Sequence, residues 1–343
     1  MKTILVTGAG GYIGSVLTDL LLEKGKKVIG YDRYFFGEDL LGSTLHHPNF
    51  KFIKKDIRDI EIKDFKGVDA VCDLASLSND PSGDIDEKIT YSINHLGRVR
   101  VACLAKKAGI KKYIIASSCS VYGAGDSNSL TEESKVNPLT TYAKANIKAE
   151  NDILPLADYS FSVTVLRLAT VYGISKRMRF DLVLNLMTLN AFKKGTIFVM
   201  GGGKQWRPLV HVRDVAHVFE KVINTIELKK INGEIFNVGS NEQNFQILNI
   251  SYIIRDSIPF PIALDIIPDD PDKRSYNVLF DKIKKFLNFS PGFSPEDGVK
   301  EIYNTLKSGK IDNDIKTVTV KWYKNILEAK KLIDNVYLDG RLL

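Results

Sequence analysis

Short apolar runs rich in β-branched residues alternate with longer stretches of helical spacing over the first half of the chain. A strand that is apolar on both faces is typical of a parallel sheet that helices cover on both sides. The predicted strands are residues 3–7, 27–31, 50–55, 70–74, 112–116 and 161–168, and the predicted helices are residues 13–24, 85–108 and 142–156. This alternation predicts an α/β domain with a doubly wound parallel sheet.

Beyond this first domain, residues 1–173, the pattern loosens into short strands, loops and helices that prolines interrupt. We interpret residues 174–295 as a smaller α/β substrate lobe and residues 296–343 as a C-terminal extension of two helices on the outside of the fold. A strand and a helix around residues 209–237 are expected to return to the first domain. Asp214 is the predicted N-cap of that helix.

The composition is that of a folded globular protein, since 44% of the 343 residues are hydrophobic and 26% are charged. The three cysteines, Cys72, Cys103 and Cys119, show no CxxC spacing, which argues against disulfides and zinc and favours a reducing cytoplasm. No apolar run approaches the roughly 18 residues of a membrane span. We therefore expect a soluble, cytoplasmic protein without a membrane partner.

The chain carries a formal net charge of +7, but its lysines are spread in pairs rather than gathered in one arm. Solvated surface is the simpler interpretation of this charge, and nucleic acid is not an expected partner. His46 and His47 precede a proline in a predicted loop, and His211 ends a predicted strand. Because no cysteine or carboxylate cluster completes a ligand set around them, we predict no metal site.

Three glycines with GxxGxxG spacing, Gly8, Gly11 and Gly14, follow the first predicted strand and open the first helix. The first glycine suits a tight turn, the second lets the backbone approach a pyrophosphate, and the third brings helix and strand close together. The helix start at Tyr12 and Ile13 then presents free N–H groups to phosphates. These features predict a dinucleotide-binding Rossmann fold.

Asp32 ends the second predicted strand, about 20 residues further on, where a carboxylate accepts hydrogen bonds from the adenosine ribose. A carboxylate at this place favours NAD, although Arg33 beside it leaves NADP open as an alternative. Asp56 and Ile57 close the third strand, where they would hold the adenine. A helix cap is the competing interpretation of Asp56, and both can hold.

Further motifs follow in order, and together with the glycine spacing they resemble the extended short-chain dehydrogenase/reductase superfamily, in particular its NAD-dependent nucleotide-sugar epimerase/dehydratase family, which is typified by UDP-glucose 4-epimerase. The resemblance covers nearly the whole chain and is carried by Leu74-Ala75, Asn94-His95-Leu96-Gly97, Ser117-Ser118-Cys119-Ser120-Val121-Tyr122-Gly123, Tyr142-Ala143-Lys144-Ala145-Asn146 and Arg167-Leu168-Ala169-Thr170-Val171-Tyr172-Gly173. It implies NAD as the cofactor and a nucleotide diphosphate sugar as the substrate. The cofactor contacts that it adds are Leu74, Ala75, Ser117, Tyr142, Asn146 and Leu168.

Within this resemblance, Tyr142 would be the base that removes a proton from a sugar hydroxyl, and Ser118 would hydrogen-bond the same oxygen. The family places a lysine four residues after the tyrosine to help it ionise near neutral pH, but this chain has Asn146 there. Lys144 and Lys148 point elsewhere, because a helix turns about 100° per residue. Either the charge of the nicotinamide suffices, another cation enters the site, or the chain is a weakened relative.

The sugar is expected to meet Ser78 and Asn79, after the fourth strand, unless these two only form the turn before Pro81. Thr170 occupies a place where many relatives have asparagine. Cys119 would be an acid/base group, or simply a small buried residue. Because Cys119 and Ser120 stand where dehydratases of the family carry an Asp-Glu pair, that elimination is disfavoured.

The resemblance also implies a clamp for the diphosphate, formed by Asn185, Arg207 and Arg274 with Arg179 as a further candidate. Arginine suits this role, since a guanidinium bonds phosphate oxygens in pairs. For Arg179 a surface position is equally compatible with the sequence. The resulting hypothesis is an NAD-dependent nucleotide-sugar epimerase that moves a hydride at C4 of the sugar. Net C4 oxidation or reduction, and a binding protein without activity, are the alternatives.

A homodimer is also expected, by the resemblance only. Relatives pair the helices that correspond to residues 85–108 and 142–156 into a four-helix bundle.

Overall fold

The computed structural model describes residues 1–124, 129–269, 272 and 274–342, and its core is a parallel sheet. Within these residues the sheet has seven strands in the order β10-β6-β5-β4-β1-β2-β3, and every neighbouring pair is parallel. The strands are β1 Thr3–Thr7, β2 Lys27–Asp32, β3 Phe50–Lys54, β4 Ala70–Asp73, β5 Lys112–Ser118, β6 Ser162–Leu168 and β10 Glu234–Val238. The predicted doubly wound α/β fold is therefore confirmed.

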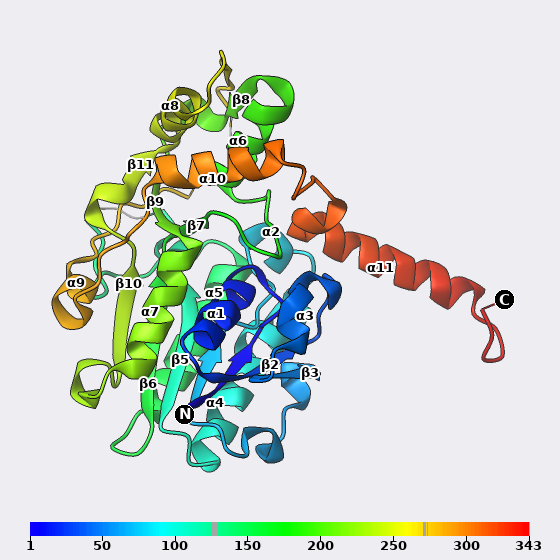
Figure 1. Cartoon of the computed structure of the whole chain (residues 1–343), viewed down its shortest axis with the longest axis vertical. Helices are drawn as coiled ribbons and strands as arrows, with labels where there is room; N and C mark the ends of the chain where they lie inside the picture. The colour runs from blue at the N-terminus through cyan, green and yellow to red at the C-terminus, as the bar shows by residue number, and fades with distance from the viewer. Residues whose placement is uncertain (125–128, 270–271, 273, 343) are drawn as a thin grey trace.

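Helices cover both faces of this sheet, as Figure 1 shows. Along β1, Ile4 and Val6 belong to one hydrophobic cluster, whereas Leu5 between them belongs to the other. Side chains of a strand alternate between its faces, so the two clusters are the two sides of the sheet. One side is packed by α1 Tyr12–Glu23 and α7 Val212–Asn224, and the other by α4 Arg98–Lys107 and α5 Thr141–Ile153.

The predicted helix 85–108 consists of three helical segments. They are α3 Glu87–Tyr91, a π-helical segment Ser92–Gly97, and α4. Inside the π segment, Asn94 is fully buried; its Oδ1 accepts from the backbone N of Leu77 at 2.8 Å, and its Nδ2 donates to the carbonyl of Leu77 at 3.1 Å. This exchange fixes the helix against the loop that follows β4.

The second half of the chain adds two small sheets. A three-stranded sheet has the order β11-β9-β7, and β12 pairs in parallel with β8. Their bounds, with those of the helices nearby, are β7 Thr170–Tyr172, β8 Thr196–Val199, β9 Trp206–His211, β11 Asn244–Gln246, β12 Ala263–Ile266, α6 Val183–Lys194, α8 Ile247–Ser257 and α9 Asp281–Leu287. In the sequence, α7 and β10 lie between β9 and β11 of the three-stranded sheet, but α7 packs on α1 and β10 pairs with β6.

The N-cap of α7 differs from the prediction. His211 holds that position, and its Nδ1 accepts from the backbone N of Arg213 at 3.2 Å. Asp214 lies inside the first turn instead, where its carboxylate accepts from the backbone N of Gly292 at 2.9 Å and of Phe293 at 3.2 Å. The carboxylate therefore ties the helix start to a distant loop rather than capping it.

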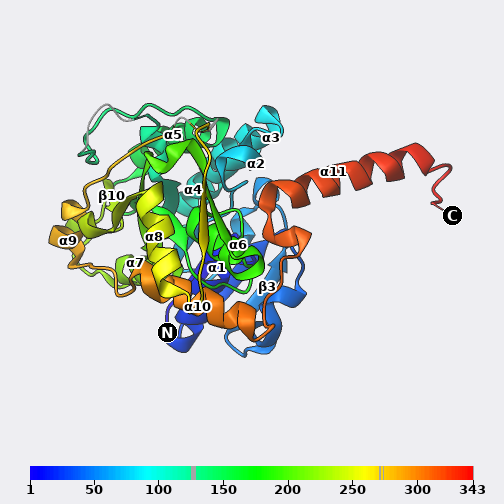
Figure 2. The ribbon, with the colours of Figure 1, turned by 90° about the horizontal axis from the view of Figure 1, so that it is seen from above.

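The C-terminal extension comprises α10 Pro295–Lys307, which packs on α6, and α11 Thr319–Val336. Figures 1 and 2 show α11 projecting away from the body of the molecule. Its first turns touch the body, because the indole of Trp322 donates to the carbonyl of Phe35 at 2.7 Å. Among the described residues, no helix is long and apolar enough to cross a membrane.

Candidate active site

A pocket of about 620 Å³ opens at the carboxyl ends of the parallel strands. Ligands of doubly wound sheets bind at this edge, and the volume falls within the range of small-molecule sites. Of the residues predicted for the site, those that line it are Gly8, Gly11, Tyr12, Ile13, Gly14, Asp32, Asp56, Ile57, Leu74, Ala75, Ser78, Asn79, Ser117, Ser118, Tyr142, Leu168, Thr170, Arg179, Arg207 and Arg274. Asn146, Cys119 and Asn185 do not.

The glycine turn has no room for a side chain at two of its positions. Gly8 has a φ of +71°, and a Cβ atom on it would lie 2.8 Å from the backbone N of Ala75. A Cβ atom on Gly14 would lie 2.0 Å from the carbonyl oxygen of Gly8. No side chain caps the start of α1 at Gly11, so its first N–H groups face the pocket. Free N–H groups at an open glycine turn suit the pyrophosphate of a dinucleotide.

The carboxylate of Asp32 is held at the end of β2 by two backbone N–H groups. Gly10 donates to it at 2.9 Å and Tyr34 at 2.7 Å. Burial raises the pKa of Asp32, and these two hydrogen bonds oppose that rise. Arg33, the residue that would favour NADP, instead pairs with Asp56 at 3.1 Å. The arrangement matches a ribose acceptor better than a phosphate site.

Asp56 performs the capping role that the sequence left open. Its carboxylate accepts from the backbone N of Arg58 at 2.9 Å and pairs with the guanidinium of Arg58 at 2.7 Å. These hydrogen bonds and the charge of Arg58 hold the pKa of Asp56 below its usual value despite partial burial. Asp56 and Ile57 both line the pocket as well.

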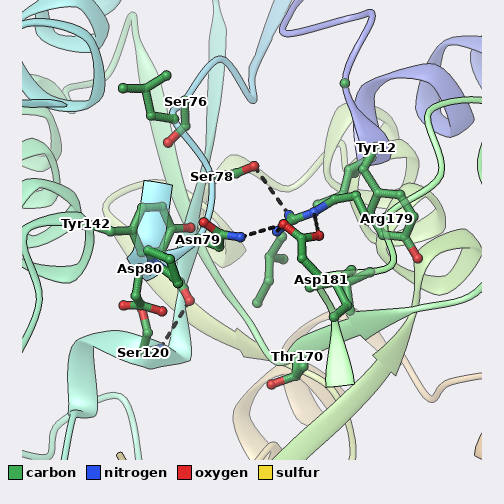
Figure 3. A pocket seen from close by; sticks show the side chains of 18 of the residues that line it. Tyr12, Ser76, Ser78, Asn79, Asp80, Ser120, Tyr142, Thr170, Arg179 and Asp181 are labelled. Atoms are coloured by element: carbon green, nitrogen blue, oxygen red, sulfur yellow. Dashed lines mark hydrogen bonds and ion pairs between the residues drawn. The ribbon is translucent and has the colours of Figure 1, made fainter. Parts of the chain in front are cut away.

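Tyr142 and Ser118 reach the pocket from neighbouring elements. Tyr142 stands at the start of α5, which Thr140 caps by accepting from the backbone N of Ala143 at 3.2 Å. Ser118 ends β5, and its Oγ accepts from the backbone N of Ser120 at 3.1 Å, which leaves its own proton to donate. Both side chains line the same cavity, and Figure 3 shows Tyr142 there beside Asp80 and Ser120.

The phenol of Tyr142 is harder to ionise than a free tyrosine. Burial raises its pKa most, and the carboxylate of Asp80 adds to the rise. Asn146, Arg98 and Arg179 act in the opposite direction without cancelling it. Ionisation of Tyr142, which a base at this position requires, therefore depends on the positive groups around it.

Asn146 lies one turn after Tyr142 and is 1% exposed. Its Oδ1 accepts from Nη1 of Arg98 at 3.1 Å, whereas its Nδ2 is buried and has no hydrogen-bond partner in the described part of the chain. The amide lowers the pKa of Tyr142, because it can donate to the ionised phenol. With the neutral phenol it forms no hydrogen bond in the described part of the chain. A buried donor without a partner next to the cavity fits a ribose hydroxyl of NAD. Lys144 and Lys148 are exposed, as predicted.

Polar side chains from the loop after β4 and from the segment before α6 form a connected network in the pocket wall. Nη1 of Arg179 donates to Oγ of Ser78 at 3.3 Å, and its Nε pairs with Asp181 at 2.9 Å. Nδ2 of Asn79 donates to the same carboxylate at 2.6 Å, as Figure 3 shows. Asn79 also caps α2 Asp80–Gly83 by accepting from the backbone N of Ser82, so the turn interpretation and the lining position both hold. Arg179 is not a surface residue, since it is 6% exposed.

Arg207 and Arg274, far apart in the sequence, meet at the pocket. Nη1 of Arg207 donates to the carbonyl of Arg274 at 2.7 Å, and both guanidinium groups pair with Asp272, at 2.9 Å and 2.6 Å. Arg274 also pairs with Asp80. Two guanidinium groups side by side at the wall of a cavity suit a diphosphate.

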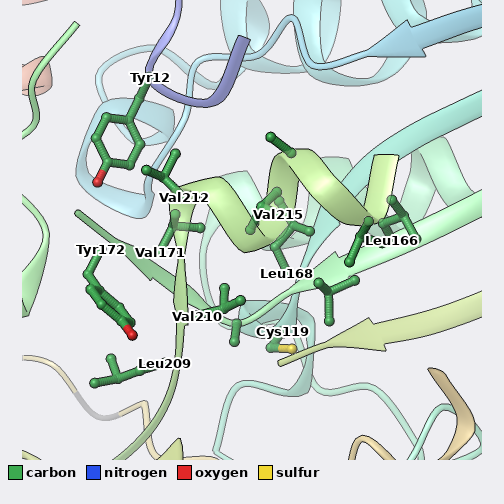
Figure 4. Packing of buried hydrophobic residues seen from close by; sticks show 14 of the residues in the cluster. Tyr12, Cys119, Leu166, Leu168, Val171, Tyr172, Leu209, Val210, Val212 and Val215 are labelled. Atoms are coloured by element: carbon green, nitrogen blue, oxygen red, sulfur yellow. The ribbon is translucent and has the colours of Figure 1, made fainter. Parts of the chain in front are cut away.

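Two residues predicted as substrate contacts, Cys119 and Asn185, do not line the cavity. Cys119 is 1% exposed and packs in the hydrophobic core beside Leu166 and Val210, where its Sγ donates to the carbonyl of Arg167 at 3.4 Å (Figure 4). Burial raises the pKa of this thiol, so it is a poor acid/base group. The small buried residue was the correct interpretation.

The side-chain amide of Asn185 forms hydrogen bonds with other residues of the protein. Its Oδ1 accepts from the backbone N of Gly173 at 3.1 Å, and its Nδ2 donates to the hydroxyl of Tyr12 at 3.1 Å and to the carbonyl of Arg179 at 2.9 Å. Neither proton of the amide group remains for a ligand. Asn185 positions two pocket residues instead of contacting the diphosphate.

The sequence analysis missed several residues of the site. Arg98 does not line the cavity, but it contacts Asn146 behind it. It could have been found, because it shares helical spacing with the buried residues Val101, Ala102 and Ala105. Arg177 lies in the pocket wall, only 3% exposed, with its guanidinium 3.7 Å from the ring centroid of Phe36. Further missed residues of the pocket wall include Asp181, before α6, and Val320 and Tyr323, from the start of α11. No local pattern marked these three.

Within the described residues, no group of three or more His, Cys, Asp and Glu side chains is placed to hold a metal ion. His211 is fully buried under Phe293, with stacked rings 4.4 Å apart between centroids. Its environment is that of a core residue.

Residues 4–239 match the NAD dependent epimerase/dehydratase family. The chain belongs to this family. Membership confirms that the chain is of an enzyme family and that NAD is its cofactor, as the glycine turn and Asp32 predicted.

Family members of known name resemble the chain over most of its length. The UDP-glucuronate 4-epimerase of Thermodesulfobacterium geofontis is 30% identical over 333 residues, which cover 90% of this chain and 97% of the relative. The UDP-glucuronic acid 4-epimerase of Bacillus cereus, solved with UDP-glucuronic acid and NAD, superimposes with a TM-score of 0.79 at 24% identity, over 89% of this chain and 99% of that one. The UDP-N-acetylglucosamine 4-epimerase of Methanobrevibacter ruminantium M1 superimposes with a TM-score of 0.81 at 23% identity, over 90% and 99%. At such identities the two solved structures show the shared fold.

Proposed function

We propose that this protein is an NAD-dependent nucleotide-sugar epimerase that acts at C4 of the sugar. The observation that carries the proposal is that Tyr142 and Ser118 face one cavity, which also holds the glycine turn and the pair Arg207 and Arg274. A redox cofactor and a diphosphate-bearing substrate would meet at this tyrosine. The 30% identical relative is a UDP-glucuronate 4-epimerase, which supports UDP as the nucleotide and C4 as the reacting carbon.

The residues of the chain divide the work between binding and proton transfer. NAD, when bound, supplies the hydride chemistry by taking hydrogen from C4 and giving it back. The glycine turn and Asp32 would hold its pyrophosphate and ribose, and Nδ2 of Asn146 would donate to the second ribose. Arg207 and Arg274 would take the diphosphate of the sugar in exchange for Asp272.

Tyr142 would remove the proton of the C4 hydroxyl as the C–H electron pair leaves that carbon, so that a C4 ketone forms. Oγ of Ser118 donates to the same oxygen and stabilises the charge that develops on it. For inversion, the ketosugar must present its other face before the hydride returns and Tyr142 gives the proton back. Ser78 and Thr170, two small side chains of the cavity wall, would border the rotating sugar.

The same residues would also serve a net C4 oxidation or reduction. A binding protein without activity is the second candidate, because Asn146 brings no charge to Tyr142. Both alternatives are decided by following the sugar and the cofactor separately.

The test begins with a thermal-shift screen of UDP-, GDP-, CDP- and dTDP-sugars in the presence of NAD. A ligand at 100 times its dissociation constant stabilises by about 2.7 kcal/mol. The sugar that binds is then incubated with the loaded protein. An epimerase yields the C4 epimer without accumulating reduced NAD, a dehydrogenase yields reduced NAD in proportion to product, and a binding protein yields neither. If Tyr142→Phe turns over as fast as the wild type, the proposed base is wrong.

We further propose a cytoplasmic homodimer that pairs α5 and the helical stretch from α3 to α4 with the same elements of a second copy. The resemblance to dimeric relatives motivates this proposal, and the exposed side chains of Ile89 and Leu96 on that stretch support it. Light scattering on Leu96→Glu tests it, since a charge in the bundle would give monomers. The division into 1–173, 174–295 and 296–343 likewise stays a proposal.

A further inference from the structure

A buried arginine lies directly behind the proposed catalytic tyrosine. Arg98 opens α4 after the π-helical segment and is 1% exposed. Its Nε pairs with Oδ2 of Asp73 at 3.1 Å, and its Nη2 donates to the carbonyls of Asp73 at 3.1 Å and Ala116 at 2.6 Å. Its Nη1 donates to Oδ1 of Asn146 at 3.1 Å. Three elements thus hold one guanidinium in a single orientation.

This contact decides which way the Asn146 amide points. A guanidinium has only donors, so the atom that faces Arg98 must be the oxygen of the amide. The Nδ2 group therefore faces the other way. It is buried and has no partner among the described residues, although a buried amide group normally has one. Because Arg98 donates to Oδ1, it also polarises the amide and strengthens Nδ2 as a donor.

The counter-ion of Arg98 does not cancel its effect on Tyr142. The carboxylate of Asp73 also accepts from Oγ1 of Thr7 at 2.5 Å and from the hydroxyl of Tyr113. These donors hold its charge on the sheet, while the Nη1 edge of Arg98 faces α5. Arg98 consequently lowers the pKa of Tyr142, and the carboxylate that raises it is Asp80 on α2.

We propose that Arg98 is the cation that replaces the absent lysine, acting through Asn146 as a positioning residue for Tyr142 and for the ribose of NAD. The proposal rests on the proposed function, since it gives Tyr142 the role of base. The charged groups that face the phenol are then Arg98, Arg179 and Asp80, with Asn146 as the dipole between Arg98 and the phenol. A network with a purely structural role would change stability without changing the titration of Tyr142.

The test measures proton release when NAD binds, by calorimetry in two buffers of different ionisation enthalpy across a pH series. The positive nicotinamide lowers the pKa of a neighbouring tyrosine, so binding releases protons, and Tyr142→Phe removes the contribution of Tyr142. Arg98→Met should raise the midpoint of the Tyr142-dependent release by about one pH unit, the low end of the effect of a nearby opposite charge. Arg98→Lys should raise it less. The acidic limb of the kcat profile should move with it.

Arg100→Met is the matched control. Arg100 lies on the same helix, is exposed, and makes one side-chain hydrogen bond, to the carbonyl of Ile60 at 3.1 Å. Its removal should leave the midpoint unchanged. If Arg98→Met does not fold because Asp73 loses its counter-ion, the double variant Arg98→Met/Asp73→Asn removes both charges and is measured instead. Adding Asn146→Lys to either variant should bring the midpoint back down.

An unchanged midpoint in the folded Arg98 variants would overturn the proposal, as would a wild type without Tyr142-dependent proton release. The proposed function is judged separately. If the midpoint moves but no sugar turns over, the proposed function fails and the role of Arg98 stands. If sugar turns over and Tyr142→Phe abolishes this while the Arg98 variants keep the wild-type profile, only the role of Arg98 fails.

Discussion

Two arginine–carboxylate clusters in this protein differ in how far water reaches them. The inner cluster, Arg98 and Asp73, has side chains that are 1% and 0% exposed. The outer cluster comprises Arg207, Arg274 and Asp272. The side chain of Arg274 is 21% exposed and that of Asp272 is 30% exposed. Further hydrogen bonds to the sheet and to α5 fix the inner pair, whereas the outer cluster borders an open cavity. The comparison indicates that the inner cluster is a fixed, buried ion pair, whereas the outer cluster is a site where one anion can replace another.

The physical reason lies in desolvation. A buried charge that loses its partner cannot recover hydration, so the inner cluster functions only as a complete unit. A charge at a pocket edge is screened by water, and a phosphate can replace its carboxylate at small cost. The predictions below separate these two behaviours.

Breaking the inner cluster should have the largest effect. Asp73→Leu leaves Arg98 buried without a counter-ion, which is expected to lower the free energy of unfolding by about 3–5 kcal/mol. Urea denaturation followed by circular dichroism measures it. Glu38→Ala, which removes an exposed partner of Lys54, is the control and should cost less than about 1 kcal/mol. If Asp73→Leu lowered the free energy of unfolding by less than about 1 kcal/mol, the inner cluster would not be shielded from water.

Breaking the outer cluster should affect binding more than stability. Arg274→Gln removes charged hydrogen bonds to a diphosphate, each worth about 1.5–3 kcal/mol, so affinity for the nucleotide sugar should fall at least about tenfold. Calorimetric titration measures it, with Arg213→Gln as the control because Arg213 is exposed and pairs with Glu301 outside the pocket. Equal affinities in the two variants would remove Arg274 from the site.

Acid should weaken the outer cluster. The two arginines lower the pKa of Asp272 to about 2, against 3.8 for a free carboxyl. The stability that it contributes is therefore complete above about pH 4 and is lost as the pH falls through 2. Asp272→Asn should remove about 1 kcal/mol or less of this pH-dependent stability, since water screens the cluster. The measurement is the urea midpoint of unfolding from pH 5 to pH 2. If the cluster contributed nothing, the midpoint would change with pH equally in the variant and the wild type.

Salt should distinguish the clusters with the smallest effect. Raising the salt concentration to about 0.5 M should weaken binding of the nucleotide sugar a few-fold, because the guanidinium group of Arg274 is partly exposed at the cavity. The midpoint of Tyr142-dependent proton release should not move, since Arg98 is buried. A midpoint that follows the salt concentration would show that solvent reaches Arg98.

The sequence predicted the sheet and the cofactor turn because both depend on local rules. Apolar runs define the strands, and the close approach of Gly14 to Gly8 leaves no room for a side chain. Local motifs likewise placed Tyr142 and Ser118. They could not show that Asn185 and Cys119 turn into the protein, because their partners, Tyr12 and Arg167 among them, come from distant segments.

Residues that act over long range were the ones missed. Tyr323 reaches the pocket only because α11 returns across the loop at Phe35 and Phe36, where its ring lies 5.8 Å and 5.6 Å from theirs. Arg98 carried a signal in its spacing, but it lies on α4, and its partner Asp73 lies at the end of β4, 25 positions earlier. The sequence thus showed that a cation was missing beside Asn146 without showing where it comes from.

The most direct test of the account follows the hydrogen at C4. A UDP-sugar deuterated at C4, starting with UDP-glucuronate, is incubated with the NAD-loaded protein and followed by NMR. The account predicts the C4 epimer with its deuterium retained at C4, no accumulation of reduced NAD, and no conversion by Tyr142→Phe. Exchange of the label with water, or accumulation of deuterated reduced NAD, would contradict a hydride that leaves and returns within one site.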